Sequence, residues 1–96
     1  MNVEFRPEVV TDLALAADWY DEREVGLGDA FIEQYRRALS MTTANPLSRP
    51  VVRSGLRWRK LLRFPYLLWY RLSDNRLVVV GLLHAHRDRT MLDDRR

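Results

Sequence analysis

The most hydrophobic part of the chain consists of two runs, at residues 64–72 and 76–84, separated by a short polar segment. Both runs are rich in aromatic or β-branched residues, and the Ser-Asp-Asn sequence between them is typical of a turn. We therefore predict two antiparallel strands joined by a short loop. The second run is apolar on both parities, which indicates a central strand that is covered on both faces.

The first half of the chain has the pattern of one strand and two amphipathic helices. Residues 2–6 alternate apolar and polar side chains, as a short half-buried strand does. Apolar residues then recur every three or four positions over 7–24 and again over 28–44, with a Gly-Leu-Gly sequence between the segments and Asn-Pro after the second. A connection this short predicts an antiparallel hairpin of helices. Asp12 and Asp18 fall on the opposite face of the first helix, where we expect solvent exposure.

The remaining residues complete a small sheet. Residues 45–55 are dense in turn-forming residues, 56–62 have the pattern of a strand with one basic face, and the tail at 85–96 is too polar and too short to add much to the core. The order β-α-α-β-β-β predicts an α+β domain in which a helical hairpin packs on one face of a small, mostly antiparallel sheet. The expected core consists of Leu13, Tyr20, Phe31, Tyr35 and Leu39 from the helices, and Trp58, Tyr66, Leu68, Tyr70, Val78, Val80 and Leu82 from the sheet.

The composition limits the class of protein. A chain of 96 residues has no room for a second core, so we expect one domain over residues 1–96. No apolar run approaches the ~20 residues that cross a bilayer, and the N-terminus lacks the pattern of a signal peptide, so we expect a cytoplasmic protein. Cysteine is absent and His84 and His86 are the two histidines, so we expect neither a metal site nor a cofactor.

The net charge of +3 hides a strong asymmetry along the chain. Residues 1–33 carry nine acidic and two basic side chains, whereas 34–96 carry fourteen basic and four acidic ones, which gives −7 and +10. Residues 49–71 contain seven cations and no acid, and one of the sixteen cations of the chain is lysine while the rest are arginine. The planar guanidinium group suits phosphate or carboxylate partners. A macromolecular docking face and an ordinary solvated surface both account for this pattern.

Short motifs follow one another in a set order along nearly the whole chain. They are Asp18-Trp19-Tyr20, Gly26-Leu27-Gly28 before Phe31, Asn45-Pro46, Arg63-Phe64-Pro65-Tyr66 leading to Trp69-Tyr70, and His84-Ala85-His86-Arg87-Asp88. In this order, at this length and with this predicted topology, the sequence resembles the RelE/ParE superfamily of bacterial toxins from type II toxin–antitoxin modules. The resemblance implies a small toxin that is held inactive by an antitoxin encoded beside it, in a complex that binds promoter DNA through the antitoxin.

The RelE-like branch of the superfamily cleaves mRNA on the ribosome. Such chemistry needs cations around the scissile phosphate and one group that exchanges a proton near neutral pH. The candidates are Arg57, Arg59, Lys60, Arg63 and Arg87 for the phosphate, and His84 or His86 for the proton. Two of the four cationic positions of that branch fall on Trp58 and Leu67, so the nuclease constellation is incomplete.

The ParE-like branch poisons DNA gyrase by binding, which needs a complementary surface and no catalytic group. The long helical hairpin and the Phe-Pro-Tyr segment resemble this branch more closely, and we favour it. The expected target-binding residues are Arg57, Arg59, Lys60, Arg63 and Arg87. We expect Trp19 and Trp69 to contact the antitoxin, because exposed aromatic side chains often mark interfaces, although burial inside the domain is the alternative for each. A degenerate member that only binds an antitoxin, a homodimer and a toxin–antitoxin hetero-oligomer all remain open.

Overall fold

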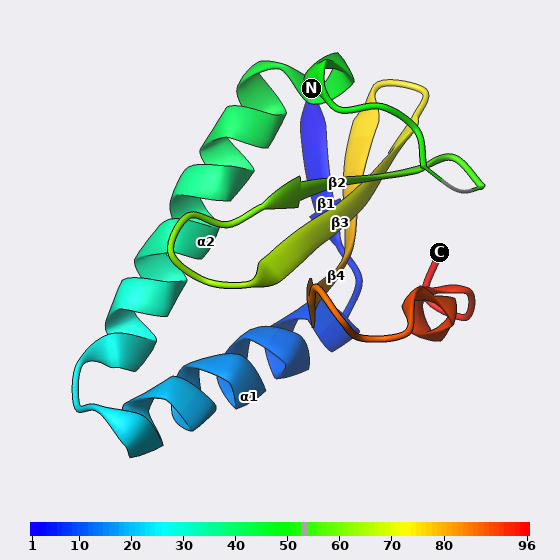
Figure 1. Ribbon diagram of the computed structural model, residues 1–96. Helices are drawn as coiled ribbons and strands as arrows, with labels where there is room; N and C mark the ends of the chain where they lie inside the picture. Colours follow the sequence, from blue (N-terminus) through cyan, green and yellow to red (C-terminus); the bar gives the residue numbers. More distant parts are fainter. Residues whose placement is uncertain (53) are drawn as a thin grey trace.

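The computed structural model describes residues 1–52 and 54–96 (Figure 1). Arg53, which belongs to the arginine-rich stretch, lies outside the described residues. The elements in chain order are β1 (Asn2–Phe5), α1 (Glu8–Arg23), α2 (Leu27–Ala44), η1 (Pro46–Ser48), β2 (Leu56–Lys60), β3 (Tyr66–Ser73), β4 (Arg76–His84) and η2 (Arg89–Leu92), where η denotes a 3-10 turn. The predicted β-α-α-β-β-β order and the α+β class are confirmed.

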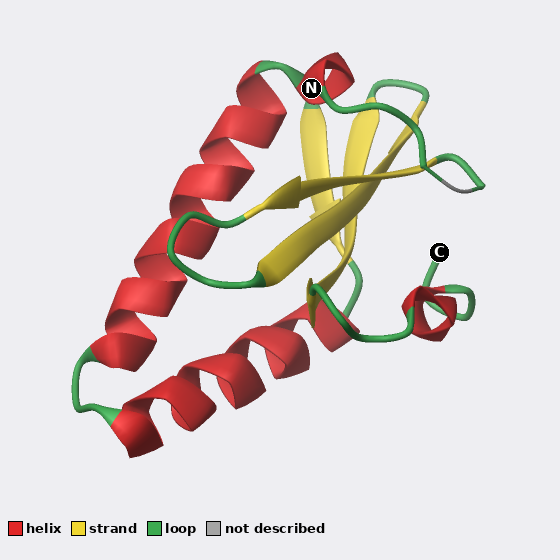
Figure 2. Cartoon of the chain, viewed as in Figure 1, coloured by secondary structure: helices red, strands yellow, loops and turns green. Residues whose placement is uncertain are grey.

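The strands form one mixed sheet in the order β1-β4-β3-β2. As predicted, β4 is central, since it pairs with β1 in parallel and with β3 antiparallel. The strand β2 pairs antiparallel with β3 and forms one edge of the sheet. Both helices pack on one face of the sheet and diverge from their short connection (Figure 2). No helix among the described residues is long and apolar enough to cross a membrane.

The connection between the helices requires glycine. Gly26 has a φ of 90°, a left-handed conformation that favours glycine. At Gly28 a Cβ atom would lie 2.5 Å from the carbonyl oxygen of Ala17, so the absent side chain lets the start of α2 approach the backbone of α1. The Gly28 amide also donates to Asp21 Oδ1 at 2.7 Å. These contacts fix the angle at which the hairpin covers the sheet.

A β-bulge changes which side chains face the helices. Trp69 pairs with Gly81 and Tyr70 with Val79, so Val80 is an extra residue in β4. Val79 therefore packs under the helices, whereas Val80 packs on the back of the sheet. The prediction that Val80 is a core residue is confirmed, but strict alternation with Leu82 would place it under the helices, whereas the bulge places it on the back of the sheet. Trp58 was assigned to the same core and also packs on the back.

The back of the sheet has its own small core. We call this the back cluster, and its members are Leu56, Trp69, Val80, Leu83 and Leu92, with Trp58 and Leu67 packed against it. Leu92 comes from η2 and is completely buried, so the expectation that the tail adds little to the core is wrong. The tail can approach because residue 81 is glycine: a Cβ atom there would lie 2.6 Å from Leu92 Cδ2.

An ion pair ties the tail to the first helix. Arg95 Nη1 and Nη2 donate to the two carboxylate oxygens of Asp12 at 2.5 and 3.1 Å, and both side chains are only about a tenth exposed. The same carboxylate accepts from the Leu82 amide at 3.1 Å. The prediction that Asp12 faces solvent is therefore wrong, because its carboxylate joins α1, β4 and the tail.

Candidate functional site

The five predicted target-binding cations lie in different parts of the fold. Arg57, Arg59 and Lys60 are on the edge strand β2, Arg63 is in the loop before β3, and Arg87 follows β4. Within the described chain, none of the five forms an ion pair with a carboxylate. Their charge is therefore available to a partner, but it is not gathered into one site.

The side chains of β2 are held by neutral acceptors. Arg57 Nη1 donates to the carbonyl oxygen of Arg49 at 2.5 Å. Arg59 donates from Nε to Thr42 Oγ1 at 3.1 Å and from Nη2 to Ser48 Oγ at 2.9 Å. Both arginines thus reach the turn that follows α2. Lys60 differs, because its ammonium group bends back onto carbonyl oxygens of the β2–β3 loop.

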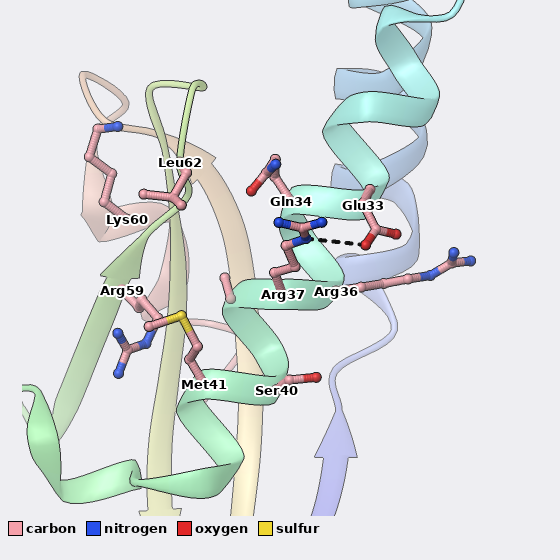
Figure 3. Close-up of a pocket in the computed structure, with 10 residues that line it drawn as sticks. Glu33, Gln34, Arg36, Arg37, Ser40, Met41, Arg59, Lys60 and Leu62 are labelled. Carbon is pink, nitrogen blue, oxygen red and sulfur yellow. Dashed lines mark hydrogen bonds and ion pairs between the residues drawn. The ribbon is translucent and has the colours of Figure 1, made fainter.

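A groove of about 560 Å³ lies between α2 and β2 (Figure 3). Its lining residues are Glu33, Gln34, Arg36, Arg37, Ala38, Ser40, Met41, Arg59, Lys60 and Leu62. Arg37 is paired with Glu33 at 3.3 Å, and the Arg36 side chain extends away from β2. Met41 and Leu62 are exposed apolar residues beside these cations. The groove therefore combines apolar surface with positive charge.

A second hollow, of about 590 Å³, lies between α1 and the end of β4. Tyr66, His84 and Arg87 line it together with Trp19 and Pro65. The Tyr66 and His84 rings are 5.4 Å apart and nearly perpendicular. The His84 Nδ1 atom accepts from the His86 amide at 3.1 Å, so the first of the two histidines faces this hollow with one ring nitrogen already bonded. Sequence reasoning named His84 and Arg87 as candidates but did not include Tyr66.

The pKa of Tyr66 depends on its burial and on the charged groups near this hollow. Burial raises the pKa of Tyr66, the positive charge of Arg87 acts in the opposite direction, and the carboxylate of Asp12 adds to the rise. The phenol therefore stays protonated and uncharged near neutral pH. Among the described residues, no group of three or more histidine, aspartate and glutamate side chains is placed to hold a metal ion.

The two tryptophans expected at the antitoxin interface have different environments. Trp19 is 49% exposed on α1, and the guanidinium carbon of Arg23 lies 3.3 Å from the centre of its ring. Trp69 is 3% exposed and belongs to the back cluster. Trp19 thus offers surface to a partner beside the second hollow, whereas the burial of Trp69 leaves little surface for one.

Trp58 and Leu67, the positions that the resemblance aligns with cations of RelE-like nucleases, face the back of the sheet. Trp58 and Leu67 both pack against the back cluster, which Leu92 of the tail closes. At these two positions the face is therefore apolar and partly buried, without the positive charge that RNA cleavage would need.

Comparison with known proteins agrees with this fold. The sequence profile of the family described as "ParE toxin of type II toxin-antitoxin system, parDE" matches residues 3–89. The chain belongs to the ParE toxin family. A solved structure of the chromosomal ParDE toxin–antitoxin system from P. aeruginosa superposes with a TM-score of 0.67, at 14% identity, over 88% of this chain and 95% of that one. No curated protein matches the sequence of this ParE family member.

Proposed function

We propose that this member of the ParE family is the toxin of a toxin–antitoxin module, that it acts by binding DNA gyrase, and that a cognate antitoxin neutralises it. The packing of Trp58 and Leu67 carries the proposal. Both positions correspond to cations in RelE-like nucleases, and both side chains here contact the back cluster. Apolar side chains cannot stabilise the charge that develops on a phosphate during cleavage.

The distribution of the remaining cations also supports binding over cleavage. Arg57 pairs with Tyr70 of β3, whereas His84 pairs with Tyr66, four residues earlier in the same strand. That separation is about 13 Å along a strand, so Arg57 is too far from His84 for the two to act on one phosphate, and only Lys60 of β2 pairs next to Tyr66. Spread-out cations suit an extended macromolecular surface better than a single reacting centre.

The second hollow is our proposed antitoxin contact. Trp19 presents an exposed ring beside it, and exposed Leu15 lines the same hollow one helical turn away. Large aromatic side chains next to a concave apolar surface are typical anchors for a partner. A complex formed there would bury Trp19, so its fluorescence would report binding.

The decisive experiment compares two assays with purified protein. We expect the chain to inhibit gyrase supercoiling and to accumulate cleaved DNA, while translation in vitro proceeds without transcript cutting. Arg57→Gln should weaken gyrase inhibition, and Arg36→Gln, which changes the charge equally on a side chain that extends away from β2, should not. Normal supercoiling at toxin concentrations in large excess over gyrase would reject the proposal.

The second hollow favours one alternative. Tyr66, His84 and Arg87 meet there, and these residue types can hold a phosphate and exchange a proton. Transcript cutting that is lost in His84→Ala and Arg87→Ala would make the chain a ribosome-dependent endoribonuclease. Inactivity in both assays, with antitoxin binding retained, would identify a degenerate member.

A further inference from the structure

Three arginines meet at the turn that follows α2, and we call Arg49, Arg57 and Arg59 the arginine cluster. Arg57 and Arg59 reach the turn from β2 through the hydrogen bonds described above, and Arg49 belongs to the turn itself. Arg49 donates from Nε to the Trp58 carbonyl at 3.2 Å, and its guanidinium lies 5.2 Å from the centre of the Trp58 ring. All three side chains are half-buried, and each donates at least one hydrogen bond within the domain.

A buried tyrosine anchors the same turn. The Tyr70 hydroxyl donates to the carbonyl oxygen of Pro46 at 2.7 Å, and the ring is completely buried. Burial raises the pKa of Tyr70, and the positive charges of Arg57, Arg59 and Arg49 all act against that rise. All three guanidinium groups are thus close enough to influence one phenol. The turn and the strand therefore hold three like charges in one small region.

In the described part of the chain, no carboxylate forms an ion pair with this cluster. Within residues 1–52 and 54–96, the ion pairs join Arg23 to Glu22, Arg37 to Glu33, Arg76 to Glu4 and Arg95 to Asp12, and none involves the cluster. Like charges that are partly removed from water repel one another and lose solvation. A bound external anion would reduce this repulsion and would compensate for the lost solvation.

The cluster also has hydrogen-bond donors to offer. A guanidinium group carries five N–H donors. The bonds described above use one donor of Arg49, one of Arg57 and two of Arg59. The acceptors are carbonyl and hydroxyl oxygens, so they orient the three groups without neutralising them. The remaining donors can bind an anion with several oxygen atoms.

We propose that the arginine cluster binds a phosphodiester group of a nucleic-acid backbone. Guanidinium groups form paired hydrogen bonds with phosphate oxygens, and arginine is preferred over lysine at such sites. Arg57 and Arg59 are two positions apart on one strand, about 7 Å, so their side chains leave β2 on the same side and can contact neighbouring phosphates. The net charge of +10 on residues 34–96 would attract a polyanion to this half of the chain.

The inference goes beyond gyrase binding and does not depend on it. It assigns a direct nucleic-acid contact to the chain, in addition to any contact with a protein target. The positions that the resemblance aligns with nuclease cations of RelE-like toxins, Trp58 and Leu67, are apolar here, and the Trp58 ring lies beside the Arg49 guanidinium. Among the described residues, the contacts of the cluster bring in no histidine or carboxylate that could exchange a proton, so we assign it binding and not cleavage.

The test measures fluorescence anisotropy of a short labelled DNA duplex with the purified chain, between about 50 and 200 mM salt. Three phosphate contacts predict a slope of about −2.7 in a plot of log affinity against log salt concentration. Arg57→Gln should reduce the size of this slope by about 0.9 and weaken binding about tenfold at the lowest salt concentration. Arg57→Lys keeps the charge and should restore the slope.

Two further variants separate the cluster from general charge. Arg36→Gln removes the same charge from an exposed position on α2, and it should leave the slope unchanged. Tyr70→Phe removes the hydrogen bond to Pro46 without changing the net charge, and it should weaken duplex binding several-fold by loosening the turn. Circular dichroism of each variant confirms that the domain is folded, so a loss of binding can be assigned to the site.

A single-stranded RNA of equal length identifies the source of the phosphodiester. Tighter binding of the duplex assigns DNA, and tighter binding of RNA assigns a transcript. Absence of binding to both, or equal losses in Arg57→Gln and Arg36→Gln, would overturn the proposal. So would poly-glutamate that binds at least as tightly and depends equally on Arg57, because the site would then recognise acidic proteins. Gyrase inhibition by the wild-type protein together with absence of duplex and RNA binding would overturn this inference and leave the proposed gyrase target standing.

Discussion

The most direct test of the fold is the replacement of Leu92, which lies in the tail that we expected to add little to the core. Leu92 is completely buried in the back cluster. Leu92→Ala removes three buried carbon atoms, worth about 0.8 kcal/mol each, or about 2.4 kcal/mol before any cavity cost. Because a terminal segment relaxes more easily than a central strand, we expect the cavity cost to be small and the total loss to be about 2.5 kcal/mol.

The assay is equilibrium unfolding in urea followed by tryptophan fluorescence. Trp58 and Trp69 contact the back cluster, so emission also reports whether the tail has detached in the folded state. Leu62→Ala is the matched control, because the same atoms are removed from a side chain that is 66% exposed, and we expect it to cost less than about 0.5 kcal/mol. A loss below about 0.5 kcal/mol for Leu92→Ala, with unchanged emission, would refute the view that the tail completes a second core.

Three further predictions concern the contacts around that core. Arg95→Gln leaves the Asp12 carboxylate about a tenth exposed and without its charged partner, so urea unfolding should show a loss of about 3 kcal/mol. Gly81→Ala places a Cβ atom 2.6 Å from Leu92 Cδ2, and we expect a loss of about 1 to 3 kcal/mol in the same measurement, with Leu92→Ala partly relieving it. Burial raises the pKa of Tyr70 above its ordinary 10.0. The folded state therefore holds this proton more tightly than the unfolded state, so stability is fully present below pH 10 and falls as the pH rises further. Thermal melts from pH 8 to above pH 10 should show this decline, and it should be smaller in Tyr70→Phe.

The elements that could be predicted are those whose pattern is local. The stripe of α2 around Phe31 and Tyr35, the breaker at Asn45-Pro46 and the apolar run of β4 each follow from neighbouring residues in the chain. The element order and the central position of β4 were predicted correctly for this reason. Short-range periodicity was sufficient because helices and strands repeat every few residues.

The parts that could not be predicted depend on contacts between distant residues. The bulge at Val80 is a matter of register between β3 and β4, and the single sequence signal for it is the isolated glycine beside it, Gly81. Asp12 looked like a solvated acid because its partner Arg95 is 83 positions away. Trp69 lay on the less apolar parity of its strand, yet the tail covers it. A polar terminal segment with one leucine gives little sequence signal of burial.

The grouping of the candidate site residues also depends on contacts between residues that are distant in the sequence. The residue types were identified from the sequence, but their grouping was not, because it depends on which edge and which end of the sheet each occupies. Arg57 and Arg59 share β2 with Lys60 and yet join Arg49 in the arginine cluster, because a turn eight or more residues earlier supplies their acceptors. Arg87 belongs instead to the hollow beside α1.

The back of the sheet is occupied by the back cluster, and this limits where partners can bind this ParE family member. With Trp58 and Leu67 packed behind the sheet, the surfaces left to partners include the arginine cluster beside the middle of β3 and the hollow with Trp19 at its Tyr66 end. An antitoxin segment seated only on the hollow would leave the arginine cluster open. Neutralisation through that contact alone would then leave duplex binding intact, whereas an antitoxin that wraps both ends would abolish it. Measuring duplex affinity of the complex therefore tells which surfaces the antitoxin covers.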